Sequence, residues 1–272
     1  MKHLREWSVF ESDSEELSSR QLSFLKAATA GWRMNPETGK IDADRVLASD
    51  VYWDGRRDGG RILVDFGEVK GEFEYNSNGL KSLEGAPRKV GGSVWVGENL
   101  LQDLVGGPEV VGGSFRCSQN PLRSLKGAPV EVGEDFGCMN TKIESLVGGP
   151  EIVGGSYYCQ GNPELVSLKG APKVLGGEFR CGTFTVRRGK WGVDEWLTIL
   201  ESEDEKTGSL ILTLLTPESL NRQIQKDPEG TMMRLKKVWN HPSFRETRSG
   251  LVFPRGYEGE MDLLGDLSDI GL

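Results

Sequence analysis

Four cysteines are the side chains of this chain with the most versatile chemistry, and they recur along it at a nearly constant spacing. The intervals between them are 21, 21 and 22 residues: Cys117, Cys138, Cys159 and Cys181. A zinc site usually takes cysteines in close pairs, and a cysteine nucleophile needs a base beside it. The chain contains two histidines, His3 and His241. We therefore predict no metal site, no cofactor and no catalytic cysteine, and we interpret the thiols as small apolar residues of a core.

A repeat of 21 residues surrounds these cysteines and explains their spacing. Five leucines recur at intervals of 21, 21, 21 and 22 residues: Leu83, Leu104, Leu125, Leu146 and Leu168. Each is followed by a Gly-Ala-Pro or Gly-Gly-Pro turn, then by a glycine-rich pair and a short apolar segment. A fixed period of about 20 to 29 residues in this order is typical of a leucine-rich-repeat solenoid. We expect its strands to stack in parallel, so that identical side chains form columns.

The unit at residues 113–133 predicts which side chains point inward. Phe115 and Cys117 alternate with polar residues, as in a strand with one buried face. Asparagines at the bend after each strand can pair with backbone groups that would otherwise be buried without partners: Asn78, Asn99, Asn120 and Asn162. Thr141 takes that place once, which predicts a weaker join between coils. The prolines of the turns favour an extended convex side rather than a helix.

These patterns divide the chain into four parts. Residues 1–70 contain a helix that opens with a capping box at Ser18 and runs to about Ala28, then a hairpin and a degenerate repeat. Residues 71–182 form five repeats and a final strand, residues 183–240 form helices, and residues 241–272 form an acidic and hydrophobic tail that we expect to be flexible. The predicted fold is a leucine-rich-repeat solenoid. It has a parallel β-sheet on its concave face, an extended or turn-rich convex side, an N-terminal helix–hairpin cap and a C-terminal α-helical cap.

Composition limits the class of partner. The chain of 272 residues carries a net charge of −8, whereas nucleic-acid binding requires clustered lysine and arginine. We interpret the short basic segment at residues 186–191 as a solvated turn. No apolar run is long enough to cross a bilayer, and residues 1–7 lack the apolar stretch of a signal peptide. We therefore expect a cytosolic protein that binds neither nucleic acid nor membrane.

The tail at residues 257–272 holds five acids and no bases, and the acids alternate with bulky apolar side chains. Two interpretations stay open for it. One is a frayed terminus without a role. The other is a short motif that folds onto a groove of a partner through its apolar side chains: Met261, Leu263, Leu264, Leu267 and Ile270.

The repeat units also carry a resemblance. Their form is SL-x-GAP-x-x-V-GG-x-F-x-C-x-x-N, as in SLKGAP at residues 124–129 and VGGSFRC at residues 111–117. This form resembles the short leucine-rich repeats of uncharacterised proteins of tailed bacteriophages, and so do residues 1–4 and 35–42. The resemblance implies a phage-encoded protein in the host bacterial cytoplasm or in the phage particle. It implies no activity and no catalytic residue.

A second resemblance is to bacterial effectors that join a leucine-rich-repeat solenoid to a cysteine-dependent ubiquitin ligase domain. That reaction needs a nucleophilic cysteine in the C-terminal domain. No cysteine follows Cys181, and Cys181 lies in phase with the repeats. The ligase interpretation is therefore set aside.

The strand residues between the buried positions predict a binding surface. The central column runs through Glu74, Trp95, Arg116, Gly137, Tyr158 and Arg180, and Asp135 belongs to a flanking column. Tryptophan, tyrosine and arginine are the residues that most often dominate protein interfaces. The alternative is a purely structural role, in which stacking across strands only stabilises the sheet, for example Trp95 over Arg116. We predict protein-binding residues in these columns: Glu74, Trp95, Arg116, Asp135, Tyr158 and Arg180.

Three functions from different classes follow. The favoured one is a non-enzymatic module that binds a host or phage protein on the concave face. The second is a structural component of the phage particle, tethered by its terminal segments. The third is an enzyme with an unrecognised site in the C-terminal helices, against which stands the lack of any nucleophile–base set, phosphate loop or metal-ligand spacing.

Overall fold

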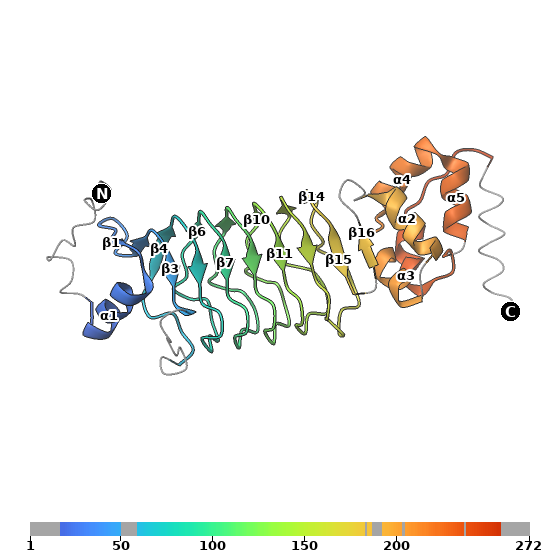
Figure 1. Cartoon of the computed structure of the whole chain (residues 1–272). Helices are drawn as coiled ribbons and strands as arrows, with labels where there is room; N and C mark the ends of the chain where they lie inside the picture. The colour runs from blue at the N-terminus through green and yellow to red at the C-terminus, as the bar shows by residue number, and fades with distance from the viewer. Residues whose placement is uncertain are drawn as a thin grey trace. The chain divides into compact units, whose positions relative to one another are not determined.

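Two compact units make up the chain, which is represented here by a computed structural model that describes residues 17–49, 59–182, 184–186, 192–202, 205–236 and 238–256. One unit consists of Met1–Leu165 and Gly170–Arg188, and the other of Val166–Lys169 and Gly189–Leu272. The first is a parallel-strand β-solenoid of about six turns, and helices dominate the second (Figure 1).

Two eight-stranded sheets line the solenoid, because most turns contribute one short strand to each sheet (Figure 1). Sheet A consists, in spatial order, of β16 (Phe184–Val186), β15 (Phe179–Cys181), β13 (Tyr157–Tyr158), β11 (Phe136–Gly137), β9 (Phe115–Arg116), β7 (Val94–Trp95), β5 (Phe73–Glu74) and β3 (Val46–Leu47). Sheet B consists of β1 (Trp32–Met34), β2 (Ile41–Ala43), β4 (Phe66–Val69), β6 (Lys89–Val90), β8 (Val110–Val111), β10 (Glu131–Val132), β12 (Ile152–Val153) and β14 (Val174–Leu175). Neighbouring strands pair in parallel except β1 with β2 and β15 with β16, at the sheet ends.

Sheet B corrects one expectation, since the side predicted to be extended and turn-rich carries a second parallel sheet. The proline of each turn precedes the strand and only removes its own N–H group. The residues that follow keep theirs: the N–H of Gly133 donates to Val111 O at 2.9 Å, and that of Gly154 to Val132 O at 2.9 Å. Two-residue strands leave almost no periodic signal in sequence, so their pairing becomes visible only when coils stack.

Columns of like side chains fill the interior, as the repeat predicted. In sheet A the aromatic column stacks ring on ring, with centroids 5.8 Å apart for Phe115 and Phe136 and 4.9 Å apart for Phe136 and Tyr157. The four cysteines form the next column and are all buried. Sheet B supplies a column of buried aliphatic residues: Val90, Val111, Val132 and Val153.

A row of glycines sets how closely the coils approach between the two sheets. A Cβ atom on Gly133 would lie 2.0 Å from Gly112 O, and one on Gly112 would lie 2.3 Å from Gly91 O. Real Cβ atoms do not approach backbone oxygen so closely, so any side chain here would push the coils apart. The glycines at these positions are therefore required by the stacked backbone of the neighbouring coils.

The asparagine ladder forms where it was expected. The Nδ2 group of Asn120 donates to Val96 O at 2.9 Å in the preceding coil and to Cys117 O at 3.0 Å in its own. Thr141 has only a hydroxyl, which lies 2.7 Å from Asn162 Oδ1 in the following coil. A single hydroxyl cannot also make the bonds that an amide makes to the preceding coil and to its own coil. The asparagine ladder is therefore interrupted at this coil.

At the N-terminal end, helix α1 (Ser19–Ala28) begins with the predicted capping box, in which Ser18 Oγ accepts from Gln21 N at 3.3 Å. Its buried residues are Phe24, Leu25 and Ala28. The hairpin of β1 and β2 follows as predicted.

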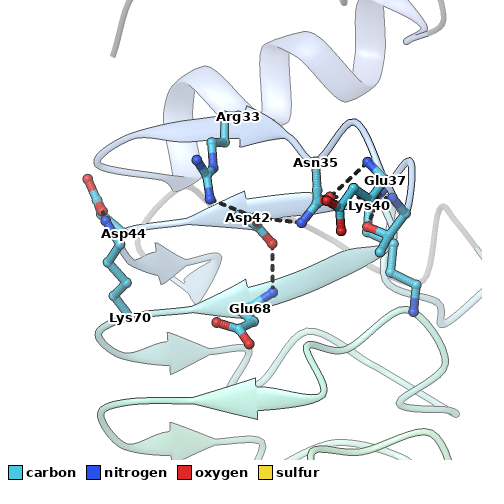
Figure 2. Close-up of polar contacts among 9 residues, drawn as sticks. Arg33, Asn35, Glu37, Lys40, Asp42, Asp44, Glu68 and Lys70 are labelled. Carbon is cyan, nitrogen blue, oxygen red and sulfur yellow. Dashed lines mark hydrogen bonds and ion pairs between the residues drawn. The ribbon is translucent and has the colours of Figure 1, made fainter. Parts of the chain in front are cut away.

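The Asp42 carboxylate ties this hairpin to the first full coil. Asp42 Oδ2 accepts from Arg33 at 3.3 Å and from Asn35 at 3.1 Å, while Oδ1 accepts from Glu68 N at 3.0 Å (Figure 2). These contacts join β1, β2 and β4. The cluster therefore has a structural role at the start of sheet B.

The second unit has four helices of eight to ten residues and two shorter ones in its described part: α2 (Val193–Ser202), α3 (Glu205–Leu212), α4 (Pro217–Lys226), α5 (Pro228–Lys236), η4 (Pro242–Phe244) and α6 (Arg245–Ser249). Thr216 caps α4, accepting from Ser219 N at 3.2 Å. The core gathers Leu197, Leu220, Leu235 and Phe244 among others.

The boundary placed at residue 240 is wrong, because helical structure continues to Ser249. Phe244 is fully buried, and the Phe253 ring lies 6.2 Å from that of Trp239. Through these two aromatic residues the segment packs against the helical core. It therefore belongs to the helical unit and not to a separate tail. Within the described ranges, none of the helices has the length and apolar character needed to cross a bilayer.

Candidate protein-binding face

The central column predicted from the sequence is a row of register partners across sheet A. Strand pairing places Glu74 beside Trp95, Trp95 beside Arg116, and Arg116 beside Gly137. Gly137 in turn pairs with Tyr158, and Tyr158 with Arg180. Parallel strands lie about 4.8 Å apart, so these six residues form one straight series of side-chain positions. We call them the sheet A row.

Exposure differs along the sheet A row. Arg116 and Arg180 are exposed, whereas Trp95, Tyr158 and Glu74 are half-buried. Trp95 is therefore less exposed than the sequence suggested, because neighbouring residues cover part of its ring. Gly137 is buried beneath its neighbours. The row presents two half-buried rings and two guanidinium groups to solvent.

One predicted binding residue, Asp135, also has a structural role. Its Oδ1 atom accepts from Ser156 N at 2.9 Å, and its Oδ2 atom lies 3.4 Å from Arg116. It belongs to a ladder in which a side-chain oxygen accepts the N–H of the next coil, as Ser93 does for Ser114 at 3.0 Å. The hydrogen bond to Ser156 makes Asp135 part of the scaffold as well as of the face.

A second ladder runs along the other flank of the row. Asn76 Oδ1 accepts from Gly97 N at 2.8 Å, and Ser118 Oγ accepts from Met139 N at 3.1 Å. Because both flanks are held by hydrogen bonds between coils, the backbone under the row is fixed before any partner arrives. Such preorganisation lowers the entropy lost on binding.

Stacking across strands is present, but in a different pair from the one suggested by the sequence. The guanidinium carbon of Arg180 lies 5.6 Å from the centroid of the Tyr158 ring. Glu178 accepts from Arg180 at 2.6 and 2.9 Å. This hydrogen bond raises the pKa of the Arg180 guanidinium, with the charge of Glu178 adding to the effect. The contacts hold both side chains of the row in place.

The four cysteines sit behind this face with unreactive surroundings. Burial raises the pKa of Cys117 and Cys159, and it raises the pKa of Cys138 to about 12 despite a hydrogen bond with Tyr157. These three thiols are therefore protonated near neutral pH, and the thiolate is the form that attacks or binds metal. Among the residues described, no group of three or more His, Cys, Asp or Glu side chains is placed to hold a metal ion.

Sequence reasoning missed one pair that resembles a nucleophile with its base. Ser209 Oγ lies 3.1 Å from His241 Nε2, although 32 residues separate them. His241 Nδ1 accepts from Ser243 N at 3.2 Å, so in the neutral ring the proton resides on Nε2. That nitrogen then donates to the serine and cannot take its proton, which is the reverse of what a catalytic base requires. The pair fits a structural role at the start of η4.

The sequence also gave no reason to examine the outer face of sheet B, because that sheet was not predicted. Val110, Ile152 and Val174 are exposed there, and Val130 is exposed just before β10. The repeat could have indicated these exposed residues, because each of them precedes the inward valine or leucine of its unit by one or two positions.

Several predicted features lie outside the described residues. These are the tail motif (Met261, Leu263, Leu264, Leu267 and Ile270), residues 50–58 of the degenerate repeat, His3, and most of the basic segment at residues 186–191.

The fold and the sheet A row together define a class: a two-sheet parallel β-solenoid, followed by a helical unit, that displays an ordered row of aromatic and charged side chains. Comparison of the chain with protein-family models, with curated proteins and with solved structures found no match.

Proposed function

We propose that this chain is a non-enzymatic protein-binding module whose partner lies against the outer face of sheet A. The observation that carries the proposal is the sheet A row, in which Trp95, Arg116, Tyr158 and Arg180 are aligned by strand register. These are the residue types that supply most of the binding energy at protein interfaces.

The chemistry of the row favours a protein over a small molecule or a nucleic acid. Arg116 has Asp135 beside it, and Arg180 has Glu178, so the positive charges are locally balanced. A phosphate backbone would need unpaired cations in a cluster. Protein interfaces are enriched in aromatic residues and arginine and have a polar rim, and this row offers both rings and paired charges.

The finer identity of the fold is part of the proposal. The 21-residue period, the asparagine ladder and the inward leucines support a leucine-rich-repeat solenoid. We assign helix α1 with the β1–β2 hairpin as its N-terminal cap and the helical unit as its C-terminal cap. The resemblance of the repeats to those of tailed-phage proteins supports a phage-encoded protein that acts on a host or phage protein in the bacterial cytoplasm.

An affinity capture from lysate of the bacterial host tests the proposal. Wild type is compared with a variant carrying Trp95→Ala, Arg116→Ala and Tyr158→Ala, and retained proteins are identified by mass spectrometry. The control variant carries Arg88→Ala, Glu151→Ala and Lys173→Ala, three residues with side chains 76%, 54% and 72% exposed and away from the row.

Each protein retained by wild type is then purified and its Kd is measured against all three forms. We expect the row variant to bind at least about 100-fold more weakly, since truncating hot-spot side chains costs several kcal/mol, and the control to bind as wild type does. Equal binding by the row variant and wild type would overturn the proposal. Thermal melts accompany the assay, because an unfolded row variant would assign the row to stability instead.

A further inference from the structure

The outer face of sheet B carries a patch of exposed aliphatic side chains. Their exposed fractions are 43% for Val110, 39% for Ile152 and 56% for Val174, and Val130, just before β10, is 60% exposed. Strand register places three of them in one row with two charged residues, in the order Lys89, Val110, Glu131, Ile152 and Val174. Adjoining aliphatic side chains on a rigid sheet indicate an interaction surface.

The two charged residues of this row differ from the charged residues beside the row in whether they form ion pairs. Arg88 pairs with Glu109 at 2.8 Å, and Lys173 pairs with Glu151 at 2.8 Å. Lys89 and Glu131 are both exposed and make no ion pair within the described ranges. The row therefore offers one positive and one negative charge, each available to a partner.

The order of three of these residues, Lys89, Val110 and Glu131, is self-complementary. Lys89 and Glu131 stand one strand on either side of Val110, at about 4.8 Å each. A two-fold axis through Val110 and parallel to the strands reverses the row, so that Lys89 of each copy faces Glu131 of the other. An axis along the solenoid would instead set Lys89 against Lys89. Self-complementarity of one patch is what a two-fold symmetric dimer requires.

We propose that the outer face of sheet B binds the same face of a second copy of this chain, with the two solenoids antiparallel about an axis at Val110. Two sheets packed face to face lie about 10 Å apart, and because each sheet is twisted the two faces separate away from the axis, which concentrates contact near it. There Val110 packs against its symmetry mate between two Lys89–Glu131 pairs. The inference does not depend on the proposed function, because the sheet A row belongs to the other sheet.

Sedimentation equilibrium of the full chain, from about 1 to 200 µM, tests the dimer and its symmetry. We expect wild type to dimerise. Lys89→Glu alone and Glu131→Lys alone each set like charges together at both pairs, and each should raise the dimer Kd by at least about tenfold. The double variant Lys89→Glu/Glu131→Lys restores opposite charges and should return the Kd to within about threefold of wild type.

An equimolar mixture of the two single variants gives an independent readout, since it should form a heterodimer although each variant alone associates poorly. Both side chains are exposed, and circular dichroism melts verify that the variants are folded. A wild type that is monomeric over the whole range would overturn the proposal. A dimer Kd that is unchanged in the single variants would also overturn it, and so would a double variant whose Kd is as high as that of the single variants. In either case Lys89 and Glu131 would not face each other.

Discussion

Asn99 joins two coils of the solenoid, because its side-chain oxygen accepts the backbone N–H of Asn78, in the preceding coil, at 3.0 Å. The same oxygen accepts from Leu80 N at 3.0 Å. Its amide nitrogen donates to Tyr75 O at 2.7 Å and to Val96 O at 3.1 Å. One buried side chain thus pairs four backbone groups that water cannot reach.

Replacing Asn99 with leucine should lower the free energy of unfolding by at least about 3 kcal/mol. Leucine keeps most of the volume, but it leaves several buried backbone groups without partners, at about 1–3 kcal/mol each. Urea denaturation followed by circular dichroism measures the loss. Leu100→Ala is the control, since Leu100 is 46% exposed and should change stability little. Similar losses for the two variants would contradict the role given to the ladder.

Thr141→Asn should strengthen the join where the ladder is interrupted. An amide there can both donate to a carbonyl of the coil before it and accept a backbone N–H from that coil, as Asn120 does with Val96 O and Leu101 N. We expect a gain of about 1 kcal/mol in the free energy of unfolding, the usual net contribution of a hydrogen bond. The same urea titration detects it, and a loss of stability would show that this coil has adapted to threonine.

Two glycines provide a matched test of backbone spacing. Gly133→Ala places a Cβ atom 2.0 Å from Gly112 O and should destabilise the solenoid by more than about 3 kcal/mol. At Gly137 the same methyl group meets Ser118 Oγ at 3.6 Å and Arg116 Cγ at 3.8 Å, both ordinary contacts. Gly137→Ala should therefore shift the melting temperature by only a few degrees in either direction. Equal shifts for the two variants would refute the close approach at Gly133.

Alkaline pH should destabilise the protein through its buried thiols. The pKa of Cys138 is about 12 in the folded chain, against an ordinary value of 9.0. Above about pH 9 the unfolded chain releases a proton that the folded chain keeps, so stability is complete below pH 9 and falls by about 1.4 kcal/mol per pH unit above it.

Cys138→Val removes this contribution, and Val96 shows that valine fits the same column. The free energy of unfolding is measured in reducing buffer at about pH 8, 9 and 10. The curve of the variant should fall less steeply than that of wild type, whose other buried thiols titrate in both proteins. Parallel curves would show that Cys138 is not shielded from solvent.

A fluorophosphonate probe, which labels activated serines, should leave Ser209 unmodified. His241 Nδ1 accepts a backbone N–H, so Nε2 carries the proton and donates it toward Ser209. Ser209→Ala should cost about 1 kcal/mol of stability and nothing else. Labelling of wild type that disappears in Ser209→Ala would reverse this assignment and revive the enzymatic alternative.

Much of the solenoid could be predicted because a stacked repeat places residues 21 apart in the sequence beside one another. The columns of Phe115, Cys117 and Asn120 are each predictable from a single unit plus the period. Register on sheet A follows in the same way, which is why Trp95, Arg116 and Tyr158 were expected in one row and are found there.

Other features could not be read from the period. The second sheet depends on two-residue strands that pair only across coils, and Asp135 became part of a ladder through the N–H of Ser156. The helical unit has no repeat, so the approach of Ser209 to His241 and the burial of Phe244 depend on how the helices pack.

By itself, the sequence determined that coils stack, which side chains fill the core, and which residues share a strand face, because each of these depends on a spacing that repeats. Tertiary structure decided which backbone groups pair between coils, which charges of the two faces form ion pairs, and how the helices of the second unit pack around its aromatic residues. These outcomes depend on contacts between positions that no period relates, and packing and hydrogen-bond geometry select among them only when the whole chain is folded.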